Sequence, residues 1–277
     1  MLAHTLGDPF NLAAVKNIAG QHNLSLIEDC CDALGATLDG KPVGTLGGYG
    51  DFEFYSARHI TMGEGGVVMM NRIPWTRLVE FFHDRGRDCW CPPGKDNTCE
   101  KCFDWKLDDL SNNYDHKYIY SHLDNNMKQT EMNATVGLSQ LAKADKFIES
   151  CKESYLWFFN AFRQAEYEEH FILSEAMPGS NPSWFGFLLT IRESSPLVRR
   201  VVVAFLESHR VGTRLLFAGN IAKQPAFLDV DYRTPVPLTN SDTIMNNSFW
   251  IGVSPGIKLP QRNHIVEAME MMIKGMA

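Results

Sequence analysis

Apolar positions in the first half of the chain form short runs that alternate with helix-like stretches. Leu12, Val15 and Ile18 recur at helical spacing after Asp8-Pro9, a pair that is typical of a helix start. The predicted strands cover 24–27, 52–55 and 67–70, and the predicted helices cover 9–20 and 75–83. Strands that alternate with helices indicate an α/β arrangement.

The second half of the chain predicts a different arrangement. Helical spacing extends over 130–162, where Met132, Val136 and Leu141 share one face. Further strands are predicted at 171–173, 184–191 and 212–217, and further helices at 197–208 and 263–273. Strands with packing helices indicate an α+β unit. We therefore expect two domains, 1–150 and 151–277, with the boundary inside the long helix.

An acidic residue lies where an α/β fold places ligands. Asp29 directly follows the apolar run at 24–27, and ligands of such folds bind outside the carboxyl ends of strands. A carboxylate there can pair with a protonated ring nitrogen, as pyridoxal enzymes require. The alternative from position alone is an ordinary helix cap or loop acid.

The segment 85–113 is polar, rich in turns and dense in cysteine. Four of the seven cysteines lie within fourteen residues: Cys89, Cys91, Cys99 and Cys102. The odd count argues against a disulfide framework and favours a reducing compartment. Such a group indicates a metal ion or an iron–sulfur cluster, with buried free thiols as the alternative.

Composition narrows the class of protein further. The 277 residues are 44% apolar and 21% charged, which is typical of a globular chain, and the net charge is −7. An acidic chain is a poor partner for nucleic acid or an anionic membrane. No apolar run reaches about 18 residues, so no transmembrane helix is expected. Residues 1–10 hold no Lys or Arg, so we expect no signal or transit peptide and a cytoplasmic location.

Several strings of residues resemble one known family. They read LIED at 26–29, DALG at 32–35, ITMGEGG at 60–66, GTRLLFAGN at 212–220 and MNNSFWIG at 245–252. These strings resemble the sugar aminotransferases of the pyridoxal-phosphate fold. Within that family the chain is most similar to the CDP-4-keto-6-deoxyglucose 3-dehydrases of lipopolysaccharide dideoxysugar biosynthesis. The resemblance runs over essentially the whole chain.

The resemblance implies a fold and two cofactors. The fold is that of the aspartate aminotransferase type I enzymes, with an incomplete large cofactor domain followed by a small α+β domain. The spacing of Cys31, Cys89, Cys91 and Cys99 resembles the dehydrases' own pattern for a [2Fe–2S] cluster. The other cofactor is pyridoxamine or pyridoxal phosphate, for which the family pattern points to Asp29.

The resemblance also implies a reaction and its partners. Relatives attach pyridoxamine phosphate to the 4-keto group of a CDP-sugar, and the 3-hydroxyl leaves after a base removes a proton from the cofactor. The cluster passes electrons from a separate flavin iron–sulfur reductase. The active site is built at a homodimer interface, where Asn126 corresponds to a phosphate contact. Arg214 and Asn220 are expected to contact the nucleotide sugar, since an Arg fork suits a diphosphate.

The sequence departs from the family pattern at the catalytic position. Arg58 stands where aminotransferases have Lys and the dehydrases have His, and an arginine neither abstracts a proton nor forms the lysine-type Schiff base. The neighbouring His59 is then the candidate base. Glu53 replaces a Ser that contacts the cofactor phosphate. The resemblance begins inside the family's chain, so roughly its first third has no counterpart here.

Two alternatives stay open at this point. The chain is either a working dehydrase or a non-catalytic relative that keeps a metal site without a working cofactor site. Zinc bound by Cys89, Cys91, Cys99 and Cys102 is the local alternative to the iron–sulfur cluster, because four thiolates also suit tetrahedral zinc.

Overall fold

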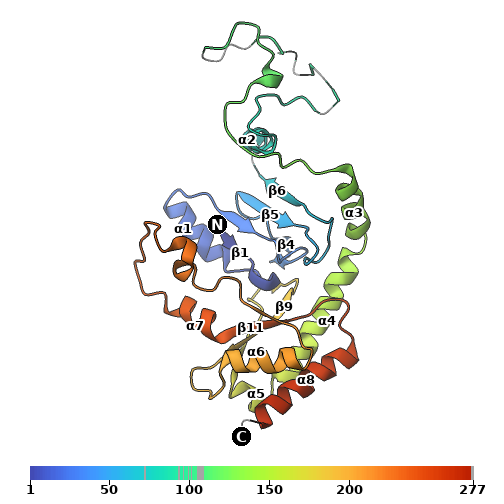
Figure 1. The fold of residues 1–277 in the computed structure, drawn as a ribbon, viewed down its shortest axis with the longest axis vertical. Helices are drawn as coiled ribbons and strands as arrows, with labels where there is room; N and C mark the ends of the chain where they lie inside the picture. Colours follow the sequence, from blue (N-terminus) through green and yellow to red (C-terminus); the bar gives the residue numbers. More distant parts are fainter. Residues whose placement is uncertain are drawn as a thin grey trace.

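Two sheets lie along the length of the molecule in a computed structural model of the chain (Figure 1). The structure describes residues 1–71, 73–92, 94–95, 97–98, 100, 102–104 and 109–275. The first sheet lies near the N-terminus, and the second lies nearer the C-terminus. The segment that follows α2 projects beyond that helix at the top of the view.

The first sheet brings together strands from residues 2–70. It contains β1 (Leu2–Ala3), β2 (Ile27–Asp29), β5 (Tyr49–Glu53) and β6 (Gly66–Met70), in that spatial order. The first three strands are parallel, and β6 is antiparallel to β5. Helix α1 (Leu12–Gln21) connects β1 to β2, and the side chain of Asn11 caps it by accepting from the backbone N–H of Ala14. Because β2 and β5 are parallel, their carboxyl ends lie at the same edge of the sheet.

A buried carboxylate fixes the loop that leads into β5. Glu28 is completely buried, and its Oε2 lies 3.1 Å from Nε2 of His4. The same side chain accepts from the backbone N–H groups of Gly44 and Leu46 at 2.9 Å, and from that of Gly47. Gly44 has a φ of +81°, a conformation that favours glycine. One side chain therefore joins β2 to the residue after β1 and to the glycine-rich loop.

The second sheet is antiparallel throughout and carries the largest apolar core. It contains β10 (Thr213–Leu215), β11 (Ser248–Gly252), β9 (Gly186–Ile191) and β7 (Phe171–Leu173), in that spatial order. Helices α4 (Ala144–Phe162), α6 (Arg199–Ser208) and α8 (Leu259–Lys274) supply the rest of this core. The side chains of Phe158, Phe162, Phe187 and Phe249 are completely buried there.

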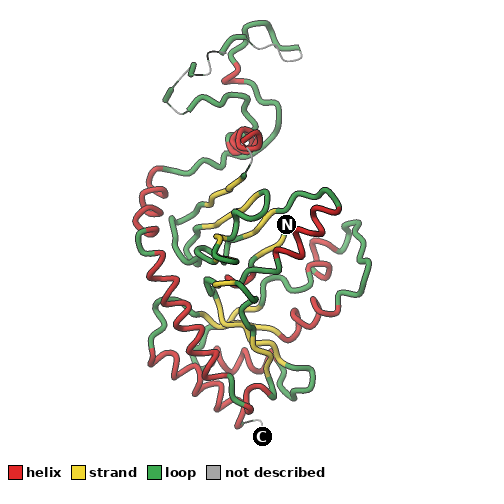
Figure 2. Tube along the Cα trace, turned by 180° about the vertical axis from the view of Figure 1, so that it is seen from behind, coloured by secondary structure: helices red, strands yellow, loops and turns green. Residues whose placement is uncertain are grey.

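The remaining elements connect or flank the two sheets (Figure 2). A third small sheet pairs β3 (Thr37–Leu38) with β4 (Lys41–Pro42) and with β8 (Ser180–Asn181), so it links the two halves of the chain. The other helices are α2 (Ile73–His83), α3 (Glu131–Leu141), α5 (Ala165–Glu168) and α7 (Thr239–Asn247). Single helical turns lie at η1 (Thr5–Gly7), η2 (His116–Tyr118), η3 (Ile221–Lys223) and η4 (Pro225–Phe227). In the described residues, no helix combines the length and apolar character needed to cross a membrane.

The structure confirms most predicted elements and corrects others. The stretch predicted as helical over 130–162 is two helices, α3 and α4, and the predicted domain boundary at residue 150 falls inside α4. The shared face of α3 is not buried, because Met132, Val136 and Leu141 are 78%, 46% and 57% exposed. The first helix begins at Leu12 rather than Pro9, because Asn11 supplies its cap. Strand β11 and helix α7 were not predicted.

We predict that Glu28→Gln lowers the free energy of unfolding by about 2–4 kcal/mol, because an amide places N–H donors against backbone N–H groups that lose an acceptor. Burial raises the pKa of Glu28, but the bonds from His4 and from Gly44 and Gly47 outweigh it, so the pKa is lowered overall. The carboxylate therefore stabilises the fold above its unfolded pKa of about 4.3, and that stability is lost as the pH falls further.

Urea unfolding at pH 7 and pH 3.5 measures this difference. The gap between the wild type and Glu28→Gln should shrink at the lower pH. The control is Glu149→Gln, whose side chain is 72% exposed and which should change stability by less than about 0.5 kcal/mol. Equal effects of the two substitutions at pH 7 would contradict the assignment.

Candidate functional site

Four carboxylates and one arginine gather where β2 and β5 end; we call them the strand-end cluster. Its members are Asp29, Asp32, Asp51, Glu53 and Arg58. Asp29 ends β2 and pairs in register with Asp51 of β5, and Glu53 ends β5. Asp32 lies in the turn after β2, and Arg58 lies in the loop after β5. The parallel pairing of the two strands therefore delivers acidic side chains to one edge.

Arg58 is bound on several sides. Its Nε and Nη2 donate to Oε2 of Glu53 at 3.1 and 2.7 Å, and its Nη1 donates to Oδ1 of Asp32. The guanidinium also lies over the rings of Tyr55 and Phe185, at 5.2 and 5.4 Å. Burial acts to lower the pKa of Arg58, but Glu53 and Asp32 outweigh burial and raise it. Arg58 is therefore a fixed cation that cannot serve as a base.

Asp29 lies beside a thiol and a second carboxylate. Its Oδ1 accepts from the backbone N–H of Cys31 at 3.1 Å, and the Cys31 thiol donates to Oδ2 of Asp51 at 3.4 Å. Oδ1 of Asp51 is buried and has no hydrogen-bond partner in the described part of the chain. Burial raises the pKa of Asp51, and the charge of Asp29 raises it further. Carboxylate groups are therefore crowded together at this edge of the sheet.

His59 is buried against the second half of the chain. Its Nε2 lies 3.1 Å from both the carbonyl oxygen and the hydroxyl of Ser183. Because a carbonyl only accepts, Nε2 carries the hydrogen and Nδ1 is the unprotonated nitrogen. Burial lowers the pKa of His59 to about 4. The ring is therefore neutral at pH 7 and only weakly basic.

A cavity connects three of the residues that the sequence singled out. It has a volume of about 310 Å³ and is lined by Arg58 and His59 from the first half of the chain. Arg214 of β10 and Trp250 of β11 line it from the second sheet. The cavity therefore pairs the catalytic position of the family pattern with one predicted substrate contact.

The other predicted contacts lie apart from this cavity. Asn220 is buried, its Nδ2 donates to Asp242 at 2.7 Å, and its Oδ1 accepts from the backbone N–H of Ala222 at 3.1 Å. Both polar ends of Asn220 are thus bound to its own chain, as the cap of η3. Asn126 is exposed and forms an antiparallel bridge with Asp84. Neither residue lines the cavity beside Arg58.

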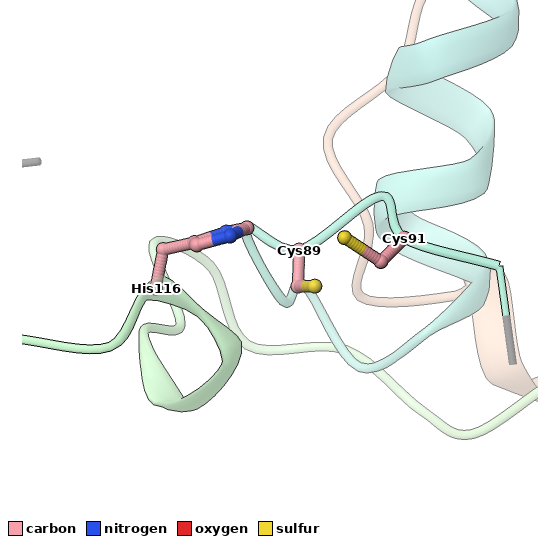
Figure 3. Close-up of side chains that lie close together, drawn as sticks. All are labelled: Cys89, Cys91 and His116. Carbon is pink, nitrogen blue, oxygen red and sulfur yellow. The ribbon is translucent and has the colours of Figure 1, made fainter. Parts of the chain in front are cut away.

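The predicted cluster ligands fall into different groups. Ligand atoms of Cys89, Cys91 and His116 all lie within 4.8 Å of one another, and Figure 3 shows Cys91 and His116 pointing toward Cys89 from opposite sides. Cys31 forms a separate group with Asp29 and Asp51. Cys99, the remaining predicted ligand, lies outside the described residues. The described residues therefore bring two of the four predicted thiolates together and place a histidine with them.

Comparison with known proteins identifies the family. Residues 1–270 match the model of the DegT/DnrJ/EryC1/StrS aminotransferase family. The chain belongs to this family. It is 48% identical over 270 residues to the lipopolysaccharide biosynthesis protein RfbH of Salmonella typhimurium, a match that covers 98% of this chain and 61% of RfbH.

Two further relatives are sugar 3-dehydratases by name. The dTDP-4-dehydro-2,6-dideoxy-D-glucose 3-dehydratase of Saccharopolyspora spinosa is 45% identical over 269 residues, 97% of this chain and 58% of the relative. The solved structure of the E. coli GDP-4-keto-6-deoxy-D-mannose-3-dehydratase with bound hydrated PLP gives a TM-score of 0.82 at 24% identity, covering 96% and 65% of the two chains. The fold is therefore that of the PLP-dependent aminotransferases, as the sequence predicted. The chain spans about three-fifths of the length of these curated relatives.

Sequence reasoning did not indicate the contacts that three residues make at these sites. Asp51 was missed because the strand was predicted from residue 52, whereas β5 begins at Tyr49 and pairs Asp51 with Asp29. Asp32 lies in a matched string but gave no signal of its contact with Arg58. His116 lies far along the chain from Cys91, so no local spacing indicated that they would meet.

We predict that the wild type loses about 3 kcal/mol of stability between pH 7 and pH 4 through His59. The folded pKa of about 4 lies below the usual 6.5, so the unfolded chain binds more protons than the folded chain in this interval. Stability therefore decreases as the pH is lowered. His59→Gln keeps an N–H donor for Ser183, and over the same pH interval it should lose about 3 kcal/mol less stability than the wild type.

Chemical unfolding at several pH values checks the prediction. His22→Gln is the control, since His22 is exposed, and its stability profile should match the wild type. A His59→Gln profile with the same slope as the wild type would show that His59 is not buried in its neutral form.

Proposed function

We propose that the chain is a nucleotide-sugar 3-dehydratase-type protein that has lost its proton-transfer residue. Its substrate class is a nucleotide-activated 4-keto-6-deoxy sugar, and CDP-4-keto-6-deoxyglucose of lipopolysaccharide dideoxysugar biosynthesis is the specific compound. Support for the class comes from the relatives named above. The observation that supports the loss of the proton-transfer residue is the binding of Arg58 to both Glu53 and Asp32.

The cavity beside Arg58 suits part of such a substrate. Arg214 offers a guanidinium, and Phe185 and Trp250 offer aromatic surface. An Arg fork binds diphosphate oxygens in a bidentate manner, and an aromatic ring can pack against a sugar or base. Arg214 also donates to the carbonyl oxygen of Thr213 at 2.7 Å, which holds the side chain in place.

Pyridoxamine phosphate does not fit the residues at the strand-end cluster as they stand. Asp29 has the position and the charge to pair with the ring nitrogen, which supports one end of the group. Glu53 brings a negative charge to the place of the family's phosphate contact, and a carboxylate about 4 Å from a phosphate charge costs roughly 4 kcal/mol at an effective dielectric of 20. Arg58 offsets part of that cost by pairing with Glu53, but its donors already serve Glu53 and Asp32 and are not available to the phosphate.

No other residue of the cavity replaces the missing base. His59 has an unprotonated Nδ1 and lines the same cavity. Its pKa of about 4 makes it a weak base at neutral pH. Its Nε2 is bound to Ser183, which holds the ring against the second half of the chain. We infer that the chain does not consume substrate unaided, and that the homodimer, the flavin reductase and the [2Fe–2S] cluster of the working relatives do not restore turnover while Arg58 is present.

We predict that Glu53→Ser combined with Arg58→His gains turnover. The pair removes the misplaced carboxylate and supplies an imidazole, and general base catalysis contributes about a hundredfold or more. With added pyridoxamine phosphate and CDP-4-keto-6-deoxyglucose, chromatography should show substrate loss at least about tenfold above the wild type.

The matched control is Glu53→Ser combined with Arg58→Gln, which removes the same charges but supplies no base. It should remain as inactive as the wild type. Turnover by the wild type, or equal rates for the two double variants, would contradict the proposal. Loss of that wild-type turnover in His59→Asn would then identify His59 as the base.

A further inference from the structure

A cavity between the N-terminal segment and the second sheet carries an inference that is independent of the proposed function. It has a volume of about 260 Å³ and shares no lining residue with the cavity beside Arg58. Its walls come from residues in and after β1, from Tyr155 on α4, and from residues of β9. Of the described residues that line it, only Asp8 carries a charge at pH 7. We call it the Asp8 cavity.

Aromatic side chains form part of the walls. Phe10, Tyr155 and Trp184 all line the Asp8 cavity. Tyr155 and Trp184 are buried and stacked, with ring centroids 3.6 Å apart and an angle of 2° between the ring planes. The hydroxyl of Tyr155 donates to the carbonyl oxygen of Ser174 at 2.7 Å, which fixes the stack. Because the face of an aromatic ring attracts a cation, these walls favour a positively charged ligand.

Asp8 is a half-buried carboxylate with weak hydrogen-bond partners. Its Oδ1 lies 3.4 Å from the backbone nitrogen of Met177 and 3.2 Å from the hydroxyl oxygen of Ser180. That hydroxyl has a single hydrogen and lies closer, at 2.7 Å, to the carbonyl oxygen of Met177. Taking a carboxylate out of water is unfavourable unless a cation or strong donors replace the water. Asp8 therefore also favours a cationic ligand.

The electrostatics of Asp8 agree with this geometry. Burial raises the pKa of Asp8 by more than Met177, Ser180 and the charge of His4 lower it. In the part of the chain that the structure describes, no lysine or arginine forms an ion pair with Asp8. The carboxylate thus faces the cavity without a counter-ion from its own chain.

A neighbouring cavity has the opposite character. It has a volume of about 470 Å³ and lies against the same pair, Tyr155 and Trp184. Lys152 and Arg163 line it together with one acid, Glu175. Its cations outnumber its carboxylate among the described residues, so it is a poorer site for a cation than the Asp8 cavity. The charge of a ligand therefore distinguishes the two cavities.

We propose that the Asp8 cavity binds a small organic ammonium ion, with the charged nitrogen against the carboxylate of Asp8 and the alkyl groups against the rings of Phe10 and Trp184. Contact with aromatic faces is the chemistry by which proteins recognise quaternary ammonium groups. The volume lies below the range of about 300–1,000 Å³ that is typical of pockets for drug-sized ligands. The ligand is therefore a small amine rather than a nucleotide. Binding makes and breaks no covalent bond.

Calorimetric titration of the full chain with choline tests the need for a positive charge. The matched neutral ligand is 3,3-dimethyl-1-butanol, which has the same shape and no charge. We expect choline to bind at least about tenfold more tightly than the alcohol. The side chain in Asp8→Asn keeps its shape and an acceptor for Met177 but has no charge, so this variant should bind choline at least about tenfold more weakly than the wild type.

Two further variants locate the binding. Glu175→Gln is the matched control, because Glu175 lines the neighbouring cavity and not the Asp8 cavity, and it should bind choline as the wild type does. Ala3 is exposed and lines the Asp8 cavity. Ala3→Leu should therefore block binding without removing a buried contact, which keeps the test valid if Asp8→Asn does not fold.

Three results would overturn the site. Equal affinities for choline and 3,3-dimethyl-1-butanol would show that charge is not recognised. Choline binding that is lost in Glu175→Gln but kept in Asp8→Asn and Ala3→Leu would place the ligand in the neighbouring cavity. No saturable binding of choline up to about 10 mM would exclude an ammonium site.

Discussion

Charge balance at the end of two parallel strands constrains the rest of this site. Strands β2 and β5 end side by side, so Asp29, Asp51 and Glu53 come to one edge of the sheet. Two carboxylates about 5 Å apart repel by about 3 kcal/mol at an effective dielectric of 20. Arg58 offsets part of that repulsion by binding Glu53, and it also binds Asp32. An arginine held in these two ion pairs cannot also accept a proton.

The same constraint links the fold to the functional proposal. In the proposed function, Asp29 is the acid that pairs with the cofactor ring, and the loop after β5 is the place of the proton-transfer group. That loop holds a permanent cation, Arg58, with a second acid, Glu53, beside it. Glu53 and Arg58 form an ion pair, with Nη2 of Arg58 at 2.7 Å from Glu53. We therefore interpret the two residues together, as an ion pair at the place that the proposed function assigns to proton transfer.

Sequence patterns predicted helices and strands better than contacts between distant segments. The helix at 75–83 and the strands at 67–70 and 171–173 were confirmed within two residues, because their apolar spacing is regular. The break between α3 and α4 was missed, since apolar spacing continues across it. At the site, the matched strings located Asp29 and Arg58, but they could not show that Arg58 binds Asp32. Such a contact depends on how the turn after β2 faces the loop after β5, which no local pattern encodes.

The cysteine segment shows the same limit. Spacing along the chain groups cysteines by sequence distance, whereas a metal groups them by distance in space. The pairing of 87–88 with 119–121 brings His116 to Cys89 and Cys91, and the end of the first sheet keeps Cys31 with Asp29 and Asp51. The contacts of the cysteine segment and those of the strand-end cluster are therefore separate.

The most direct test of the central claim is an absorbance titration of the wild-type chain with pyridoxamine phosphate at neutral pH. In the proposed function Glu53 stands at the place of the phosphate contact, and the donors of Arg58 already serve Glu53 and Asp32, so the phosphate gains no donor from Arg58. We therefore predict no saturable binding below about millimolar concentration. Saturable binding at micromolar concentration would show that the strand-end cluster accepts the cofactor despite Glu53 and Arg58, and would contradict the account.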